Sequence, residues 1–196
     1  MSKNPTPERR QRIENVLSQR QVDLTLVLAN IHDPHNVSAI YRSCDAFGIP
    51  EVHLYYTDTP FPTLAKKTSA SARKWVESMR HSDKESLFST LREKGMQIIA
   101  TACSPTARPL GQWDLTKPTA IIMGNEHSGV APELAQDIDG EIYIPMRGMI
   151  QSFNVSVAAA ILLGEASRQR DLKGMYEHIS YSKEEYAKKL ALWLDK

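Results

Sequence analysis

The feature that most constrains the fold of this chain is a set of short, nearly continuous apolar runs. Residues 24–29 read Leu-Thr-Leu-Val-Leu-Ala, and residues 119–123 read Thr-Ala-Ile-Ile-Met. Runs of this kind, without polar alternation, are typical of strands that are covered on both faces, as in a parallel sheet. They fall far short of the ~20 apolar residues that a bilayer span needs. They therefore predict an α/β domain and no membrane segment.

Helical patterns alternate with the apolar runs, which predicts a mostly parallel sheet flanked by helices. The expected strands are residues 24–29, 51–56, 96–102, 119–123 and 141–144. The expected helices are residues 7–20, 36–47, 82–94, 132–136, 154–170 and 182–194. Ligands of such sheets bind beyond the carboxyl ends of the strands. We therefore expect chemistry in the loops after residues 29, 102, 123 and 144.

Composition limits the class of protein. The chain has 196 residues, of which 41% are apolar, about the size of one domain. Its two cysteines, Cys44 and Cys103, have no metal-type spacing, which argues against a disulfide framework or a cysteine-based zinc site. The charged N-terminus has no apolar core of a secretory signal. A reduced, cytoplasmic location is expected.

The net charge of +1 conceals an uneven distribution of charge. Residues 1–20 carry a local charge of +3 and residues 66–94 carry +4, whereas residues 104–140 carry −3. Such segregation permits a basic face that binds a phosphate backbone. On charge alone, an ordinary solvated helix surface is the better explanation.

Three of the expected loops have an unusual polar composition, and two of them contain glycine, at Gly124, Gly129 and Gly148. They are Asn-Ile-His-Asp-Pro-His-Asn at 30–36, Gly-Asn-Glu-His-Ser-Gly at 124–129, and the segment 145–154. No Gly-x-Gly-x-x-Gly follows the first strand, and no Gly-Lys-Ser/Thr occurs. The dinucleotide-binding fingerprint and the Walker A loop are thus both absent, which disfavours an NAD-dependent oxidoreductase.

These loops carry three segments that, together and in this order, resemble the motifs of the SPOUT RNA ribose methyltransferases. The motif-one segment is residues 36–48, with Asn36, Arg42 and Asp-Ala-Phe-Gly at its end. The motif-two segment is residues 121–129, and the motif-three segment is residues 144–158. Details of residues 35–40 and 174–176 resemble the subgroup of bacterial tRNA (guanosine-18) 2′-O-methyltransferases. Phe153 departs from that subgroup, which usually has leucine there.

The resemblance implies an architecture as well as an activity. It implies a deep trefoil knot over about residues 119–170 and a homodimer with the cofactor pocket near its interface. The chain would divide into an N-terminal basic helix (1–21), the methyltransferase domain (22–172) and a C-terminal helical extension (173–196). Small residues of the long helix, such as Ala158 and Gly164, suit a close dimer contact or tight packing on the helix's own sheet.

The implied methyl donor is S-adenosylmethionine, held largely by backbone groups. By matching position, its pocket would be lined by Thr101, Ala102, Gly124, Ile144 and Phe153. No metal is expected, because the methyl sulfonium is already activated.

Five residues are implied in catalysis. Arg42 would stabilise the developing 2′-alkoxide and grip an RNA phosphate, with proton removal by the phosphate as an alternative. Asn36 could orient Arg42, bind the ribose or cap its helix. Glu126 could orient Arg42, contact the nucleotide or be a solvated loop carboxylate. Ser152 and Asn154 could fix their loop, touch RNA or cofactor, or cap the following helix.

The expected function is 2′-O-methylation of a guanosine ribose in the tRNA D-loop, at position 18. Methylation of ribosomal RNA or of another tRNA position, and RNA binding without catalysis, are the alternatives. Phosphate contacts would position the RNA. The candidates for these contacts are Arg9, Arg10, Arg12, Lys66, Lys67, Arg73 and Lys74, with Arg168 and Arg170 as weaker ones.

Overall fold

The chain folds around one parallel sheet. The computed structural model describes residues 5–62, 72–125 and 129–196. Within them the sheet has seven strands in the order β3-β2-β1-β6-β4-β7-β5, and every pairing is parallel. The strands are β1 (Leu24–Ala29), β2 (Glu51–Tyr55), β3 (Glu77–His81), β4 (Gln97–Thr101), β5 (Arg108–Pro109), β6 (Thr119–Met123) and β7 (Gly140–Tyr143). The predicted α/β class with a parallel sheet is confirmed.

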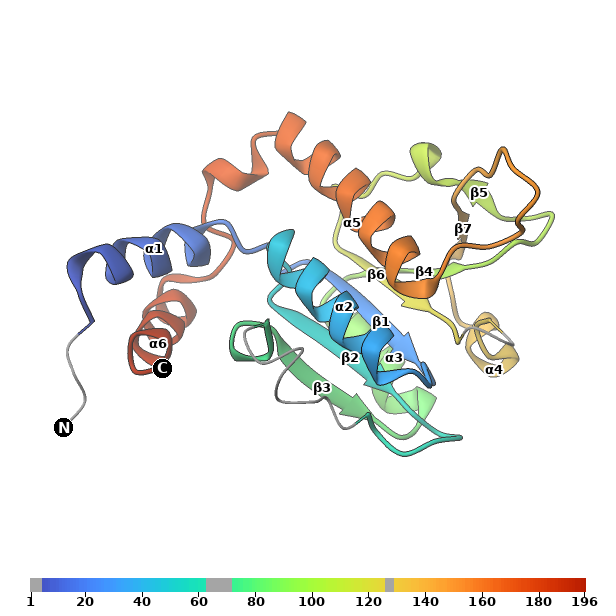
Figure 1. Ribbon diagram of the computed structural model, residues 1–196, viewed down its shortest axis with the longest axis horizontal. Coiled ribbons are helices and arrows are strands. Elements are labelled where there is room, and N and C mark those ends of the chain that lie inside the picture. Colours follow the sequence, from blue (N-terminus) through green and yellow to red (C-terminus); the bar gives the residue numbers. More distant parts are fainter. Residues whose placement is uncertain (1–4, 63–71, 126–128) are drawn as a thin grey trace.

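Helices cover both faces of the sheet (Figure 1). The α-helices are α1 (Pro7–Ser18), α2 (Pro34–Ala46), α3 (Lys84–Glu93), α4 (Pro132–Ala135), α5 (Val155–Leu172) and α6 (Lys183–Leu194). Short 3₁₀ turns are η1 (Ala72–Lys74), η2 (Leu110–Gln112) and η3 (Met175–Glu177). Side chains of α2 and α5 pack on one face of the sheet, and those of α3 and α4 pack on the other.

The central strands β1 and β6 are buried along their whole length. Leu26 and Ile121 face the core under α2 and α5, whereas Val27 and Ile122 face the core under α3 and α4. This two-sided burial is the reason why these strands read as continuous apolar runs.

The sequence did not reveal the edge strand β3. Its residues, Glu-Ser-Met-Arg-His, pair only with β2 and are largely exposed. An edge strand of this composition has no apolar run to detect. Helix α2 also begins two residues before the expected start, because Asp33 caps it and Pro34 occupies its first turn. The interpretation of Asn36 as a helix cap is therefore wrong.

The first and last helices lie side by side, away from the sheet (Figure 1). Ile13 and Leu17 of α1 pack with Trp193 of α6 in a small cluster of their own. Among the described helices, none is both long and apolar enough to cross a bilayer.

Two arginines are fully buried, Arg20 and Arg170. The Arg170 guanidinium donates to Asp23 Oδ1 at 2.5 Å, to Gln21 Oε1 at 3.0 Å and to the Leu115 carbonyl at 3.0 Å. It thereby ties the end of α5 to the segments that enter β1 and β6. The prediction that Arg170 contacts RNA is wrong, because a charge held inside the protein by these acceptors cannot reach solvent.

A buried histidine pair joins β2 to β3. His53 Nδ1 and His81 Nε2 lie 2.9 Å apart, and His81 Nδ1 lies 3.1 Å from Ser86 Oγ. Burial, with His53 as a second cause, lowers the pKa of His81 from 6.5 to about 4. The unfolded chain therefore binds a proton at a higher pH than the folded chain does.

We expect the free energy of unfolding to be insensitive to this pair above pH 6.5 and to fall between pH 6.5 and 4. The loss should be about 2–3 kcal/mol. Urea unfolding at pH 7.5 and 4.5 measures it, and His81→Gln should remove most of this pH dependence. His178→Gln, at an exposed position, is the control. An equal pH dependence in the wild type and both variants would contradict the assignment.

Candidate functional site

A cavity of about 580 Å³ opens at the carboxyl ends of β4, β6 and β7. Because β6 pairs with both β1 and β4, and β4 pairs with β7, the loops that follow these strands meet at one edge of the sheet. The motif-two and motif-three segments supply most of the cavity wall. Its lining residues include Thr101, Ala102, Cys103, Met123, Gly124, Asn125, Ile142, Ile144, Met146, Gln151, Ser152, Phe153, Asn154, Val155 and Leu162.

The wall of the cavity is largely apolar, with backbone groups of the three loops between its side chains. Met123, Ile142, Val155 and Leu162 are buried beneath it. The Thr101 hydroxyl donates to the Ile122 carbonyl at 3.1 Å and so links the neighbouring strands β4 and β6. Every residue predicted to line the cofactor pocket does line this cavity: Thr101, Ala102, Gly124, Ile144 and Phe153.

The motif-two loop closes tightly on itself. Asn125 and Gly129 exchange two backbone hydrogen bonds of 3.1 Å, and Gly129 has a φ of +70°. A Cβ atom on Gly124 would lie 2.1–2.3 Å from backbone atoms of Gly129 and Val130. Only glycine allows this approach. The predicted catalytic residue Glu126 lies outside the described residues.

A hydrogen bond joins the motif-one and motif-three segments. Asn154 Nδ2 donates to Asn36 Oδ1 at 3.0 Å, although the two residues are 118 positions apart. Asn154 Oδ1 accepts from the Ser156 backbone N–H at 2.8 Å and thereby caps α5. Asn154 thus both caps its helix and holds the motif-one segment beside the cavity, while Ser152 lines the cavity as an exposed side chain.

Arg42 lies on α2 in the motif-one segment, and its side chain is exposed. It is not part of the cavity wall. Within the described residues it has neither a hydrogen bond nor an ion pair through its side chain. The structure thus brings Asn36, Asn154 and Ser152 together at the cavity. Arg42 follows Asn36 on the same helix, and no carboxylate of the described residues pairs with its positive charge.

The predicted RNA contacts occupy different environments. Arg10 donates to Glu14 at 3.0 Å on the outside of α1, and Arg168 pairs with Glu165 at 2.7 Å. Arg73 and Lys74 are exposed in η1. Arg9 and Arg12 line a second pocket that shares no lining residue with the cavity. Lys66 and Lys67 lie outside the described residues.

The sequence analysis did not identify Asn30, which fixes the backbone conformation directly after β1. It is buried and has a φ of +48°, in the left-handed region. Its Oδ1 accepts from the backbone N–H groups of Thr57 and Asp58, and its Nδ2 donates to their side chains. An asparagine directly after a buried strand is the signal that could have found it, because asparagine tolerates this conformation better than most residues do.

Comparison with known proteins gives consistent matches. The model of the SpoU rRNA Methylase family matches residues 23–164. The tRNA (guanosine(18)-2′-O)-methyltransferase of Thermus thermophilus is 48% identical over 191 residues, 97% of this chain and 98% of that protein.

Solved structures resemble the whole fold. The TrmH/SpoU tRNA modifying enzyme of A. aeolicus has a TM-score of 0.88 and 39% identity, with 95% of each chain covered. The AdoMet-bound rRNA methyltransferase of Sinorhizobium meliloti has a TM-score of 0.68 and 27% identity, covering 80% of this chain and 59% of that one.

Substitution of Gly124 tests whether the cavity depends on the closed motif-two loop. In Gly124→Ala the added Cβ forces the loop open, so we expect at least a tenfold loss of S-adenosylmethionine affinity by isothermal titration calorimetry. Gly148→Ala, where nothing lies within 4 Å of the added atom, should stay within twofold of the wild type. Equal affinities for the two variants would show that the cofactor does not depend on this loop.

Proposed function

The chain belongs to the SpoU rRNA methylase family, and we propose that it transfers a methyl group from S-adenosylmethionine to the ribose 2′-hydroxyl of guanosine 18 in the tRNA D-loop. The family name refers to ribosomal RNA. The relative that matches this chain over nearly its full length is named for guanosine 18 of tRNA. That full-length match is the observation that carries the choice of substrate. It also makes the protein a methyltransferase.

The cavity at the carboxyl edge of the sheet suits the proposed methyl donor. Its apolar wall can take the adenine ring and the methionine chain, and backbone groups at Ala102, Gly124 and Ile144 can bind the polar edges. When bound, the donor supplies a methyl group already activated on a sulfonium. Thr101 and Phe153 would complete the pocket. A relative from the same family is described with AdoMet bound.

The acceptor hydroxyl is the difficult partner in this reaction, because a neutral ribose hydroxyl is a weak nucleophile. Arg42 carries the positive charge that we assign to stabilising the developing alkoxide and holding an adjacent phosphate. Its exposed, unpaired guanidinium supports that assignment. Asn36 and Asn154, through their hydrogen bond, position the motif-one segment relative to the cavity. Ser152 and Glu126 are proposed to contact the nucleotide.

We further propose that the protein works as a homodimer. The motif-three segment exposes apolar side chains beside the cavity: Met149 is 99% exposed, Ile150 64% and Val157 46%. Exposed apolar groups gathered in this way mark a surface that another protein covers. Arg42 lies outside its own cavity wall, so in a dimer the arginine that serves a cavity need not come from the same protomer.

The finer architecture remains part of the proposal. We propose that residues 119–170 form a trefoil knot, that residues 1–21 and 173–196 are helical extensions of a 22–172 methyltransferase domain, and that the reaction needs no metal. The substrate implies a cytoplasmic location, where Cys44 and Cys103, which are free in the structure, would stay reduced.

Methyl transfer from labelled S-adenosylmethionine to an unmodified tRNA transcript tests the function directly. Label should map to the ribose of guanosine 18, with ribosomal RNA as the comparison substrate. Arg42→Ala should lower kcat at least 100-fold, because the charge on the alkoxide is no longer compensated. Cofactor affinity should be unchanged, since Arg42 does not line the cavity.

The matched control is Arg92→Ala, which removes an exposed arginine of α3 that pairs with Asp139. It should retain wild-type kcat. Label on ribosomal RNA alone would keep the chemistry and refute the tRNA substrate, whereas full activity of Arg42→Ala would refute the role of Arg42.

Light scattering after size exclusion tests the dimer. The wild type should have twice the mass of the 22.1 kDa chain, and the double variant Ile150→Glu/Val157→Glu should shift it toward the monomer mass, because two buried carboxylates would face each interface. A double variant at exposed positions outside the motif-three segment, Leu172→Glu at the end of α5 and Leu192→Glu on α6, should remain dimeric. A wild-type monomer at micromolar concentration would refute the proposal.

A further inference from the structure

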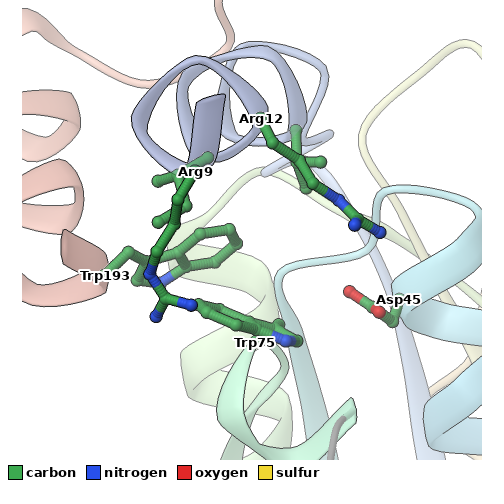
Figure 2. Close-up of a pocket in the computed structure, with 7 residues that line it drawn as sticks. Arg9, Arg12, Asp45, Trp75 and Trp193 are labelled. Carbon is green, nitrogen blue, oxygen red and sulfur yellow. The ribbon is translucent and has the colours of Figure 1, made fainter. Parts of the chain in front are cut away.

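A second pocket, of about 290 Å³, lies between the terminal helices and the entrance to the sheet. It is lined by Arg9, Arg12, Ile13, Val16, Asp45, Trp75 and Trp193. Figure 2 shows Arg9 and Arg12 extending from α1 into this space, with Trp75 and Trp193 on one side and Asp45 opposite Arg12. None of these residues belongs to the cofactor cavity.

Two tryptophans form the aromatic wall of the pocket, and one of them is only partly covered. The Trp75 and Trp193 rings lie 4.7 Å apart at an angle of 57°. Trp193 is buried, and the Arg20 guanidinium lies 5.2 Å from its ring centroid. Trp75 is only half-buried. The Trp75 ring therefore packs against Trp193, and the Lys196 ammonium lies 5.5 Å from its centroid, while the rest of its surface is exposed.

The cations of the pocket have no partners of their own. Within the described residues neither Arg9 nor Arg12 forms an ion pair, whereas their neighbour Arg10 pairs with Glu14 on the outer side of the helix. The carboxylate in the pocket, Asp45, is held at 2.5 Å by the buried Arg20. The pocket therefore has an excess of positive charge, and a ligand with negative charge would balance it.

We propose that this pocket binds one unstacked nucleotide of the RNA substrate, with its base against Trp75 and its phosphate between Arg9 and Arg12. Single-stranded RNA is recognised in this way, by aromatic faces that stack on bases and by cations that follow the backbone. The inference rests on the proposed function, because that function supplies the RNA. It adds a subsite at the opposite end of the sheet from the cofactor cavity (Figure 1).

Packing between the terminal helices does not account for the pocket. It explains why Trp193 is buried against Ile13 and Leu17. It does not explain why Arg9 and Arg12, which are exposed on α1, extend over this wall without forming an ion pair among the described residues. A nucleotide provides both the flat ring and the anion that this wall is built to contact.

Steady-state methyl transfer to tRNA, with filter binding of the same tRNA, tests the subsite in the full-length protein. We expect Arg9→Ala/Arg12→Ala to raise both KM and Kd for tRNA about tenfold and to reduce the salt dependence of binding. Trp75→Leu should raise KM at least fivefold, and Trp75→Phe, which keeps an aromatic face, should recover most of the affinity. In all three variants kcat at saturating tRNA should stay within twofold of the wild type.

Lys117→Ala, which removes one exposed charge away from the pocket, is the matched control. If the pocket variants raise KM no more than Lys117→Ala does while the wild type methylates tRNA, the subsite is refuted and the proposed function stands. If Trp75→Leu fails to fold by circular dichroism, the arginine variants and Trp75→Phe decide the outcome.

A fluorescence titration separates the subsite from catalysis. A short unstructured RNA oligonucleotide should quench tryptophan emission in the wild type, because a stacked base quenches indole, and this quenching should be lost in Trp75→Phe but kept in Trp113→Phe. Trp113 is buried beside β7. Absence of quenching would refute the stacking contact, whereas quenching without any methylation of tRNA would retain the subsite and refute the proposed function.

Discussion

The rest of the structure depends on the pairing of β1 with β6. Both strands are buried on both faces, and their five register pairs run from Leu24–Thr119 to Leu28–Met123. Each buried aliphatic side chain contributes about 1.5–3 kcal/mol relative to an exposed one. This pairing requires helices on both faces, and it aligns the carboxyl ends of two strands that are nearly 100 positions apart in sequence. The chain therefore leaves β1 toward the motif-one segment and β6 toward the motif-two loop at the same edge of the sheet.

Different physical interactions fix the two parts of the candidate active site. The cavity is shaped by apolar packing and by the tight backbone turn at Gly124. The acceptor side depends on polar contacts between segments, above all the Asn154–Asn36 hydrogen bond and the cap on α5. Arg42, on α2, is exposed and lies outside the cavity wall. A preformed donor pocket beside an open, charged acceptor surface suits a small cofactor and a large RNA.

Burial explains which of these features could be predicted from the sequence. The strands β1 and β6 and the helix α5 were found because two-sided burial leaves apolar runs and a long helical period. The edge strand β3 left no such trace, and β5 has only two residues. The cavity lining was found through the motifs, but the Asn154–Asn36 contact was not, since it depends on tertiary structure. The sequence also suggested that Arg170 lies at the surface, because arginine is usually exposed. In the structure it is buried by the segments that contain Asp23 and Leu115.

The environment of each arginine divides the basic residues of this protein into groups with different roles. Arg20 and Arg170 are buried and satisfied by carboxylates and carbonyls, so they stabilise the fold. Arg10 and Arg168 pair with glutamates one helical turn away, and such exposed pairs contribute little to stability. Arg9, Arg12 and Arg42 have no ion-pair partner among the described residues. Net charge counts all of these groups equally, so the value of +1 does not reveal which arginines lack an ion-pair partner.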